Sequence, residues 1–307
     1  MANVQFTFQL QRLAAYKPSD SHKSKNTFTS GRAILERGGY ATKGEEGWDA
    51  LEKLALAALD QGNLEVADRC IKLLTDKFPG SPRVDTLAGI RIEATEPPET
   101  ALAYYDDLLE NDPTNYAAWR RKAQVYRAMG KLDRAVDELS GMLDTFYSDI
   151  DAWLELADVY ASCKLYTYAL QSLSHALLLS PQNPSYFLQY AETAYLAEDV
   201  PLALKMFLHT VDMTDDDDGD LAPSDSIPTD ITLRAWFGVK LCTHKLIQDP
   251  RASSSSASDT PAPNPSNLSL LDDLSTERLR TAYLNLKNES PPQGDSDLIA
   301  ALATLVK

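Results

Sequence analysis

Small and large apolar residues recur along the chain at a fixed spacing. Five alanines follow one another at steps of 34 residues: Ala67, Ala101, Ala135, Ala169 and Ala203. When repeat frames begin at residues 48, 82, 116, 150 and 184, the eighth position is small in every frame: Ala55, Gly89, Ala123, Ala157 and Ala191. The twenty-fourth position is large and apolar in every frame: Ile71, Tyr105, Leu139, Leu173 and Phe207. The chain therefore contains a five-fold internal repeat.

This pattern predicts that each repeat is a pair of antiparallel helices. Small residues at positions 8 and 20 allow two helices to approach closely, and large residues at positions 4, 7, 11 and 24 fill the space on either side. Gly62 and Gly130, at position 15, end the first helix of their repeats, because glycine readily adopts the left-handed conformation. Proline at position 32 ends the second helix in three repeats: Pro79, Pro113 and Pro181.

A helix pair of this kind does not bury its apolar stripe alone, so neighbouring pairs must stack on one another. The period of 34 residues and its small and large positions resemble the tetratricopeptide repeat. The resemblance implies an all-α fold, a tetratricopeptide-repeat superhelical solenoid. Its inner, concave face would be lined by the first helix of each pair.

The regular spacing covers only part of the chain, and the remainder predicts further segments. In chain order we expect an N-terminal arm and capping helix at 1–47, five repeats at 48–217, an acidic loop at 218–230, one helix of a displaced sixth repeat at 231–248, a disordered Ser/Pro linker at 249–270 and C-terminal capping helices at 271–307.

Two details refine the predicted C-terminal part. Ser275 is a candidate N-cap of the first capping helix. The tail at 296–306 predicts a short apolar helix that folds back over the open end of the repeats, or alternatively docks on a partner.

The predicted concave face carries a mixture of side chains. It is apolar at Leu56, Leu59 and Ile90 and becomes first basic and then acidic along the chain. We expect six residues of this face to bind a partner: Arg120, Gln124, Arg127, Asp158, Glu192 and Tyr195. A mixed surface suits a specific protein segment better than a uniform polymer. The alternative is an ordinary solvated helix surface.

Composition narrows the class of partner and the compartment. The net charge of −16 argues against the phosphate backbone of a nucleic acid as a partner. The three cysteines lie far apart, without the spacing of a disulfide framework or a zinc site, which favours a reducing compartment. The longest apolar run, 298–306, is about half the length of a membrane span. These features predict a cytosolic chain without a direct transmembrane span.

The sequence offers no catalytic or metal-binding constellation, so we expect no enzymatic activity and no cofactor. The four histidines have neither ligand nor dyad spacing, and no glycine-rich phosphate loop is present. The aspartate run around Gly219 fails as a calcium loop, because Thr214 and Asp225 would occupy the first and twelfth ligand positions. The Lys and Asn pair of the tetratricopeptide clamp for chaperone tails is also missing from positions 5 and 9.

Several strings go beyond the general repeat pattern and resemble one family, subunit 2 of the endoplasmic-reticulum membrane protein complex. They are Phe78–Val84, Leu109–Asn115, Trp153–Tyr160, Gln189–Glu192 and Phe237–Gly238. The similarity covers about residues 45–247. The acidic insertion at 214–230, the linker at 249–268 and the N-terminus depart from it.

The resemblance implies a non-catalytic scaffold subunit, peripheral on the cytoplasmic face of the endoplasmic reticulum membrane. Its partners would be cytosolic segments of the integral subunits and a second soluble subunit, in a hetero-oligomer that supports insertion of tail-anchored and multipass membrane proteins. The alternative is a free cytosolic tetratricopeptide adaptor that binds peptide segments of chaperones or other partners.

Overall fold

A computed structural model describes residues 21–37, 44–214, 230–249 and 257–288, and every regular element in these ranges is an α-helix. The predicted all-α class is therefore confirmed. The chain divides into two compact units, residues 1–146 and 147–307, and each is described by itself. None of the described helices is long and apolar enough to cross a membrane.

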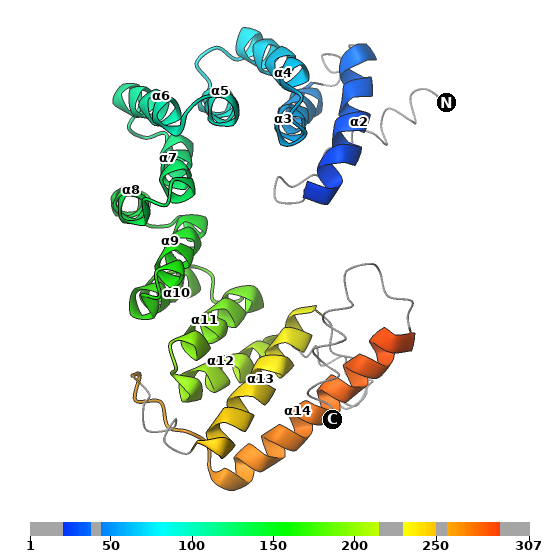
Figure 1. The fold of residues 1–307 in the computed structure, drawn as a ribbon, viewed down its shortest axis with the longest axis vertical. Helices are drawn as coiled ribbons and strands as arrows, with labels where there is room; N and C mark the ends of the chain where they lie inside the picture. Colours follow the sequence, from blue (N-terminus) through cyan, green and yellow to red (C-terminus); the bar gives the residue numbers. More distant parts are fainter. Residues whose placement is uncertain (1–20, 38–43, 215–229, 250–256, 289–307) are drawn as a thin grey trace. The chain divides into compact units, whose positions relative to one another are not determined.

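In its described residues the first unit contains helix α2 followed by three helix pairs, which can be followed along the ribbon in Figure 1. Helix α2 packs against α3, and the pairs are α3 with α4, α5 with α6, and α7 with α8. The bounds are α2 Ser21–Arg37, α3 Glu45–Asp60, α4 Leu64–Lys77, α5 Pro82–Thr95, α6 Pro98–Asn111, α7 Tyr116–Ala128 and α8 Leu132–Thr145.

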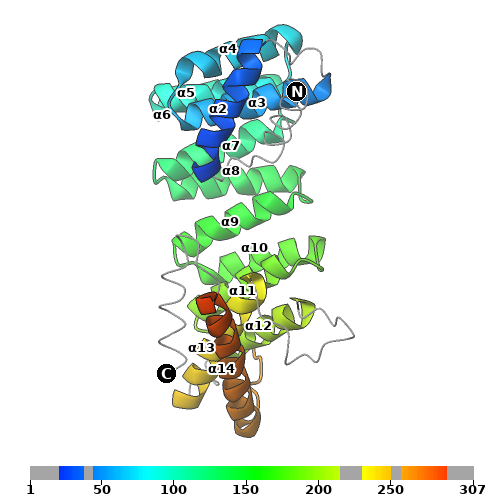
Figure 2. The ribbon, with the colours of Figure 1, turned by 90° about the vertical axis from the view of Figure 1, so that its right-hand side faces the viewer.

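Where the structure describes it, the second unit contains two helix pairs followed by two longer helices. Helix α9 pairs with α10 and α11 with α12, while α13 packs on α12 and α14 packs on α13. Helices α13 and α14 lie side by side in both ribbon views (Figures 1 and 2). The bounds are α9 Ile150–Ser162, α10 Tyr166–Leu179, α11 Pro184–Leu196, α12 Val200–Thr214, α13 Asp230–Gln248 and α14 Pro265–Asn288.

Side-chain caps fix the start of several first helices. Three N-cap side chains accept hydrogen bonds from backbone N–H groups at the start of the first helices α7, α9 and α11: Asn115, Asp149 and Asn183. Asn63 caps α4, the second helix of its pair, in the same way. Such caps satisfy N–H groups that have no partner within the helix. The sequence pattern located the repeats, and these polar residues set the helix boundaries.

The small positions of the repeat lie in the core. All five alanines of the 34-residue series are completely buried. Two glycines make even closer contacts with a neighbouring helix. A Cβ atom at Gly89 would lie 2.4 Å from the Tyr105 hydroxyl, and one at Gly238 would lie 2.4 Å from Cε1 of Phe207. At both places the absence of a side chain makes room for an aromatic ring.

The predicted linker at 249–270 is wrong in its C-terminal part. Helix α14 already begins at Pro265, a residue type that favours the first turn of a helix. Ahead of it, the backbone N–H of Ser258 donates to Oδ2 of the buried Asp199 at 3.1 Å. The other oxygen of Asp199 accepts from the backbone N–H of Leu202 at 3.2 Å. One buried carboxylate therefore caps α12 and holds the segment before α14, because both of its oxygens need donors.

Ser275 is not an N-cap. It lies inside α14, fully buried, and its hydroxyl donates to the carbonyl of Asp272 at 2.9 Å. The predicted start of the capping helices, residue 271, lies six residues after the observed start of α14, because the Ser/Pro-rich composition up to residue 270 is typical of a disordered linker. Most of the N-terminal arm, most of the acidic loop and the tail at 296–306 fall outside the described residues.

Candidate protein-binding surfaces

Polar side chains link the first helices of neighbouring repeats in the first unit. Arg83 of α5 reaches α3, where its Nη2 lies 2.6 Å from Oε2 of Glu52 and 3.5 Å from Oδ1 of Asp49. Burial raises the pKa of the Glu52 carboxyl, and the charge of Arg83 partly offsets this effect. The Arg83 guanidinium is largely exposed, so it forms the solvent edge of this contact.

The next link, between α7 and α5, is more buried. Nε of Arg121 donates to Oε1 of Glu93 at 3.0 Å, and its Nη2 donates to Oε2 of the same carboxylate. The Tyr105 hydroxyl of α6 also donates to Oε1 of Glu93, at 2.6 Å. Burial and the neighbouring Glu93 carboxylate both raise the pKa of Tyr105, so its hydroxyl remains a donor. The Glu93 carboxylate of α5 thus links this helix to both α6 and α7.

The predicted partner-binding residues of α7 differ in their surroundings. Gln124 is half-buried and accepts from Nη1 of Arg121 at 2.9 Å. Arg120 is also half-buried, whereas Arg127 is exposed. Arg121, which makes the buried link, is therefore absent from the predicted residues, although Arg120 and Gln124 are among them. An opposite charge 28 residues upstream, at Glu93, was the available signal.

In the second unit the predicted residues contact neighbouring helices. Asp158 of α9 accepts from Nε2 of Gln189 at 2.9 Å, and Glu192 of α11 accepts from Nη2 of Arg234 at 2.7 Å. Tyr195 is half-buried, and Nζ of Lys245 lies 5.2 Å from the centre of its ring. Within this unit the three residues lie at contacts between helices.

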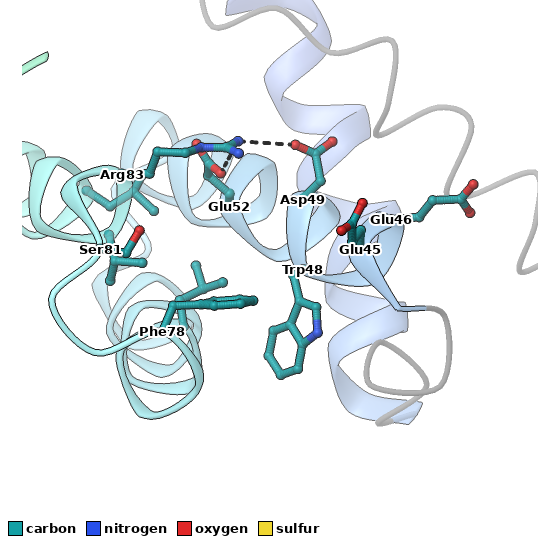
Figure 3. A pocket seen from close by; sticks show the side chains of 11 residues that line it. Glu45, Glu46, Trp48, Asp49, Glu52, Phe78, Ser81 and Arg83 are labelled. Atoms are coloured by element: carbon teal, nitrogen blue, oxygen red, sulfur yellow. Dashed lines mark hydrogen bonds and ion pairs between the residues drawn. The ribbon is translucent and has the colours of Figure 1, made fainter.

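A pocket of about 600 Å³ lies in the first unit, where the start of α3, the end of α4 and the start of α5 meet (Figure 3). Trp48 and Phe78 form one wall, with ring centres 5.6 Å apart and planes nearly perpendicular. The floor consists of buried aliphatic side chains: Leu74, Val84 and Leu87. The pocket therefore offers an apolar surface beside two aromatic rings.

The rim of this pocket is mainly acidic. Four carboxylate residues line it: Glu45, Glu46, Asp49 and Glu52. Arg83 is the one basic residue of the lining, and it spans Asp49 and Glu52 (Figure 3). Glu45 and Glu46 occupy the first turn of α3, where the helix dipole also favours negative charge. An apolar side chain next to a cationic group would fit this combination.

The described residues contain no group of three or more His, Cys, Asp or Glu side chains placed to hold a metal ion. Two of the three thiols, Cys70 and Cys242, are completely buried, and burial raises the pKa of each to about 12. A thiol with such a pKa is almost entirely protonated at neutral pH, which makes it a poor nucleophile or metal ligand.

The stacked helix pairs define a class of protein. The structure is similar to the C-terminal part of a TPR repeat-containing protein from Cytophaga hutchinsonii, with a TM-score of 0.54 over 91% of this chain and 99% of that one, at 12% sequence identity. The chain therefore has a tetratricopeptide-repeat fold.

Sequence comparisons identify the family within that class. Residues 68–207 match the model of the EMC2 TPR-like repeat domain. The chain is 31% identical over 252 residues to the ER membrane protein complex subunit 2-A of Xenopus laevis, covering 81% of this chain and 79% of the relative. It is 30% identical over 226 residues to the TPR repeat protein oca3 of Schizosaccharomyces pombe, covering 72% and 74%. The chain belongs to the family of ER membrane protein complex subunit 2.

Proposed function

We propose that the chain is a non-catalytic scaffold subunit of the endoplasmic-reticulum membrane protein complex and supports the insertion of tail-anchored and multipass membrane proteins. The observation that carries this proposal is the family membership, which extends over four fifths of the chain. The chain acts on the cytoplasmic face of the membrane and holds cytosolic segments of integral subunits together with a second soluble subunit.

The contacts between first helices support a scaffold role. Links such as Arg121 with Glu93 and Arg234 with Glu192 fix one repeat against the next. A surface whose polar groups are already held by their neighbours loses little side-chain entropy when a partner binds. The geometry of the stack is thus the chain's contribution to the complex.

The pocket beside Trp48 and Phe78 supplies a place for a partner segment. Its apolar floor and acidic rim suit a segment in which an aliphatic residue stands next to Lys or Arg. We infer that such a segment belongs to the cytosolic part of another subunit.

Affinity purification of the full chain in mild detergent tests the subunit role. Stoichiometric recovery of integral membrane proteins is the expected result. Recovery mainly with soluble chaperones would instead support a free adaptor and contradict the proposal.

Charge reversal tests the surface of α7. The variant Arg120→Glu with Arg127→Glu should reduce recovery of the integral partners and insertion of a tail-anchored client. The matched control is Arg69→Glu with Lys72→Glu on α4, the second helix of its pair. Unchanged recovery and unchanged insertion in the α7 variant would refute the assignment of this surface.

Neutralisation tests the pocket. The variant Glu45→Gln with Glu46→Gln keeps side-chain size and removes two rim charges, so partner recovery should become weaker and less dependent on salt. Its control is Glu65→Gln with Glu110→Gln, which changes exposed carboxylates that do not line this pocket. Equal recovery from both variants would show that the pocket holds no cationic segment.

A further inference from the structure

Three motifs in the described residues place a hydroxyl directly before a proline, and they differ in their backbone surroundings. They are Ser81–Pro82, Ser180–Pro181 and Thr260–Pro261. A hydroxyl followed by proline is the sequence that proline-directed protein kinases modify. The fold therefore decides which of the three hydroxyls lies in a segment that such a kinase can bind.

Ser81 and Ser180 are held at the ends of helices. The Ser81 carbonyl accepts from the backbone N–H groups of Val84 and Asp85, in the first turn of α5. The backbone N–H of Ser180 donates to the Ala176 carbonyl at the end of α10. A kinase binds the residues around its target in an extended conformation, so a turn of helix would have to unwind at either serine.

Thr260 lies in a segment of a different kind. Residues 259–264 have no regular secondary structure, and helix α14 begins only at Pro265. Thr260 is half-buried, and its neighbours Asp259 and Pro261 are exposed. A residue that precedes proline favours the extended backbone, and the further prolines at 263 and 265 favour it along the rest of the segment. This segment therefore needs no helix to unwind before a kinase binds it.

We propose that Thr260 is a phosphorylation site for proline-directed protein kinases. The γ-phosphoryl group of a nucleoside triphosphate is transferred to Oγ1 of Thr260, where a new P–O bond forms. The bond between the γ-phosphorus and the β–γ bridging oxygen breaks, and the nucleoside diphosphate leaves. The hydroxyl proton passes to the catalytic aspartate of the kinase. The phosphate adds a charge of about −1.5 to −2 at neutral pH.

The new charge lies close to the contact that holds this segment to the repeats. The hydroxyls of Thr260 and Ser258 are 2.8 Å apart, and the backbone N–H of Ser258 donates to the buried Asp199 carboxylate. Oγ1 of Thr260 is therefore within about 10 Å of that carboxylate, which is the Debye length at 0.1 M salt. Asp259, the adjacent residue, supplies a second carboxylate. Phosphorylation thus places like charges together and weakens the contact between Ser258 and Asp199.

The same contact forms part of a pocket of about 440 Å³ in the second unit. Ala257 and Ser258 make one wall of it, and the other lining residues come from the α9–α10 turn and from α10, α11 and the start of α12. Lys164 is the one cation of this lining, so a single lysine opposes the repulsion from two carboxylates. Phosphorylation of Thr260 therefore releases the segment and removes this wall of the pocket.

Phosphorylation in vitro tests the site. The purified full chain is incubated with ATP and a mitogen-activated protein kinase, and tryptic phosphopeptides are quantified by mass spectrometry. Thr260 should be modified almost completely, while Ser81 and Ser180 should reach less than about a tenth of its occupancy. Thr260→Val should abolish phosphate incorporation into the peptide 252–278.

Synthetic peptides of about nine residues, centred on each of the three hydroxyls, supply the matched control. All three peptides should be phosphorylated, because the helices that protect the two serines form only in the folded chain. Modification of Ser81 or Ser180 in the folded chain as fast as Thr260, or no modification of Thr260, would overturn the proposal.

Hydrogen exchange tests the release of the segment. Peptides that contain the Ser258 amide should exchange about tenfold faster in the phosphorylated chain, whereas peptides of α5 should not change. Unchanged or slower exchange at Ser258 would show that the phosphate leaves the Asp199 contact intact, and would refute the release. Both measurements use the chain by itself, so their outcome is independent of the scaffold role in a membrane protein complex.

Discussion

The fifteenth position of the repeat shows that a backbone conformation can persist when the residue best suited to it is absent. Gly62 and Gly130 adopt φ values of 70° and 73° at this position, and Lys164 and Glu198 adopt 61° and 65° at the same place in the fourth and fifth repeats. The stacking of the helix pairs fixes the turn. The lysine and the glutamate therefore carry backbone strain that glycine would not.

Replacing either residue by glycine should stabilise the protein. We expect Lys164→Gly and Glu198→Gly each to raise the free energy of unfolding by about 1 kcal/mol, because the left-handed strain disappears. The control is Glu96→Gly at the same repeat position, where φ is −111° and glycine only adds freedom to the unfolded chain. Urea titration followed by circular dichroism measures the changes. A loss of stability in the first two variants would show that their turns carry no strain.

The contact between Gly89 and Tyr105 predicts a large effect from a small change. Gly89→Ala should lower the free energy of unfolding by about 1–3 kcal/mol, because the added methyl group would lie 2.4 Å from the Tyr105 hydroxyl and 2.6 Å from the nearest ring carbons. Gly141→Ala is the matched control, since its nearest contact is 3.2 Å from the edge of Trp119, and its effect should be smaller.

A second substitution isolates the role of the ring. The third and fourth repeats have leucine at the position of Tyr105. In a Tyr105→Leu background, Gly89→Ala should therefore lower the free energy of unfolding much less than it does in the original chain. Equal costs in the two backgrounds would mean that the ring is not what excludes the methyl group.

At the scale of helices, the sequence predicted the elements well and their mutual contacts poorly. The 34-residue period gave both helices of each of the five pairs from α3 to α12, because burial of small and large residues imposes that period. It did not give the pairing of Arg121 with Glu93, because a period assigns a residue to a side of its helix and not to a partner 28 residues away. The start of α14 differs from the predicted one because a segment whose Ser/Pro-rich composition is typical of disorder forms the first turns of this helix.

The link between α5 and α7 should matter more than an exposed arginine on the same helix. Arg121→Met leaves the Glu93 carboxylate partly buried without its cation, and we expect a loss of about 1–3 kcal/mol, between the values for exposed and fully buried pairs. Arg127→Met, an exposed position of α7, should change the stability by less than about 0.5 kcal/mol. Thermal or urea unfolding compares the two variants. Equal changes in the free energy of unfolding for the two variants would mean that water solvates the Glu93 carboxylate as well as Arg121 does.

For the molecule as a whole, the buried thiols report on the integrity of each unit. Cys70 lies in a core cluster of the first unit and Cys242 in one of the second, and burial raises the pKa of both to about 12. A raised thiol pKa lowers the fraction of reactive thiolate at pH 8. Cys163 is only half-buried, so its access to solvent differs from that of the other two.

We expect iodoacetamide at pH 8 to modify Cys163 first in the native protein. Cys70 and Cys242 should react only at urea concentrations that unfold their units. Peptide mass spectrometry after short labelling pulses follows each site separately. Rapid labelling of Cys70 or Cys242 without urea would show that the core around it opens readily.

The close contact of Gly89 with Tyr105 also bears on how this family diverges. Neither residue can change alone without a clash or a void, so related sequences should vary at these two positions together. The chain already contains the alternative combination in three other repeats, as Ala55 with Ile71, Ala123 with Leu139, and Ala157 with Leu173. Relatives with alanine in place of Gly89 should accordingly carry a branched aliphatic residue in place of Tyr105, unless a glycine of the following helix accommodates the ring, as Gly238 does for Phe207 in the fifth repeat, where Ala191 stands at the first position. That covariation would record the helix spacing in the evolutionary history of the repeat.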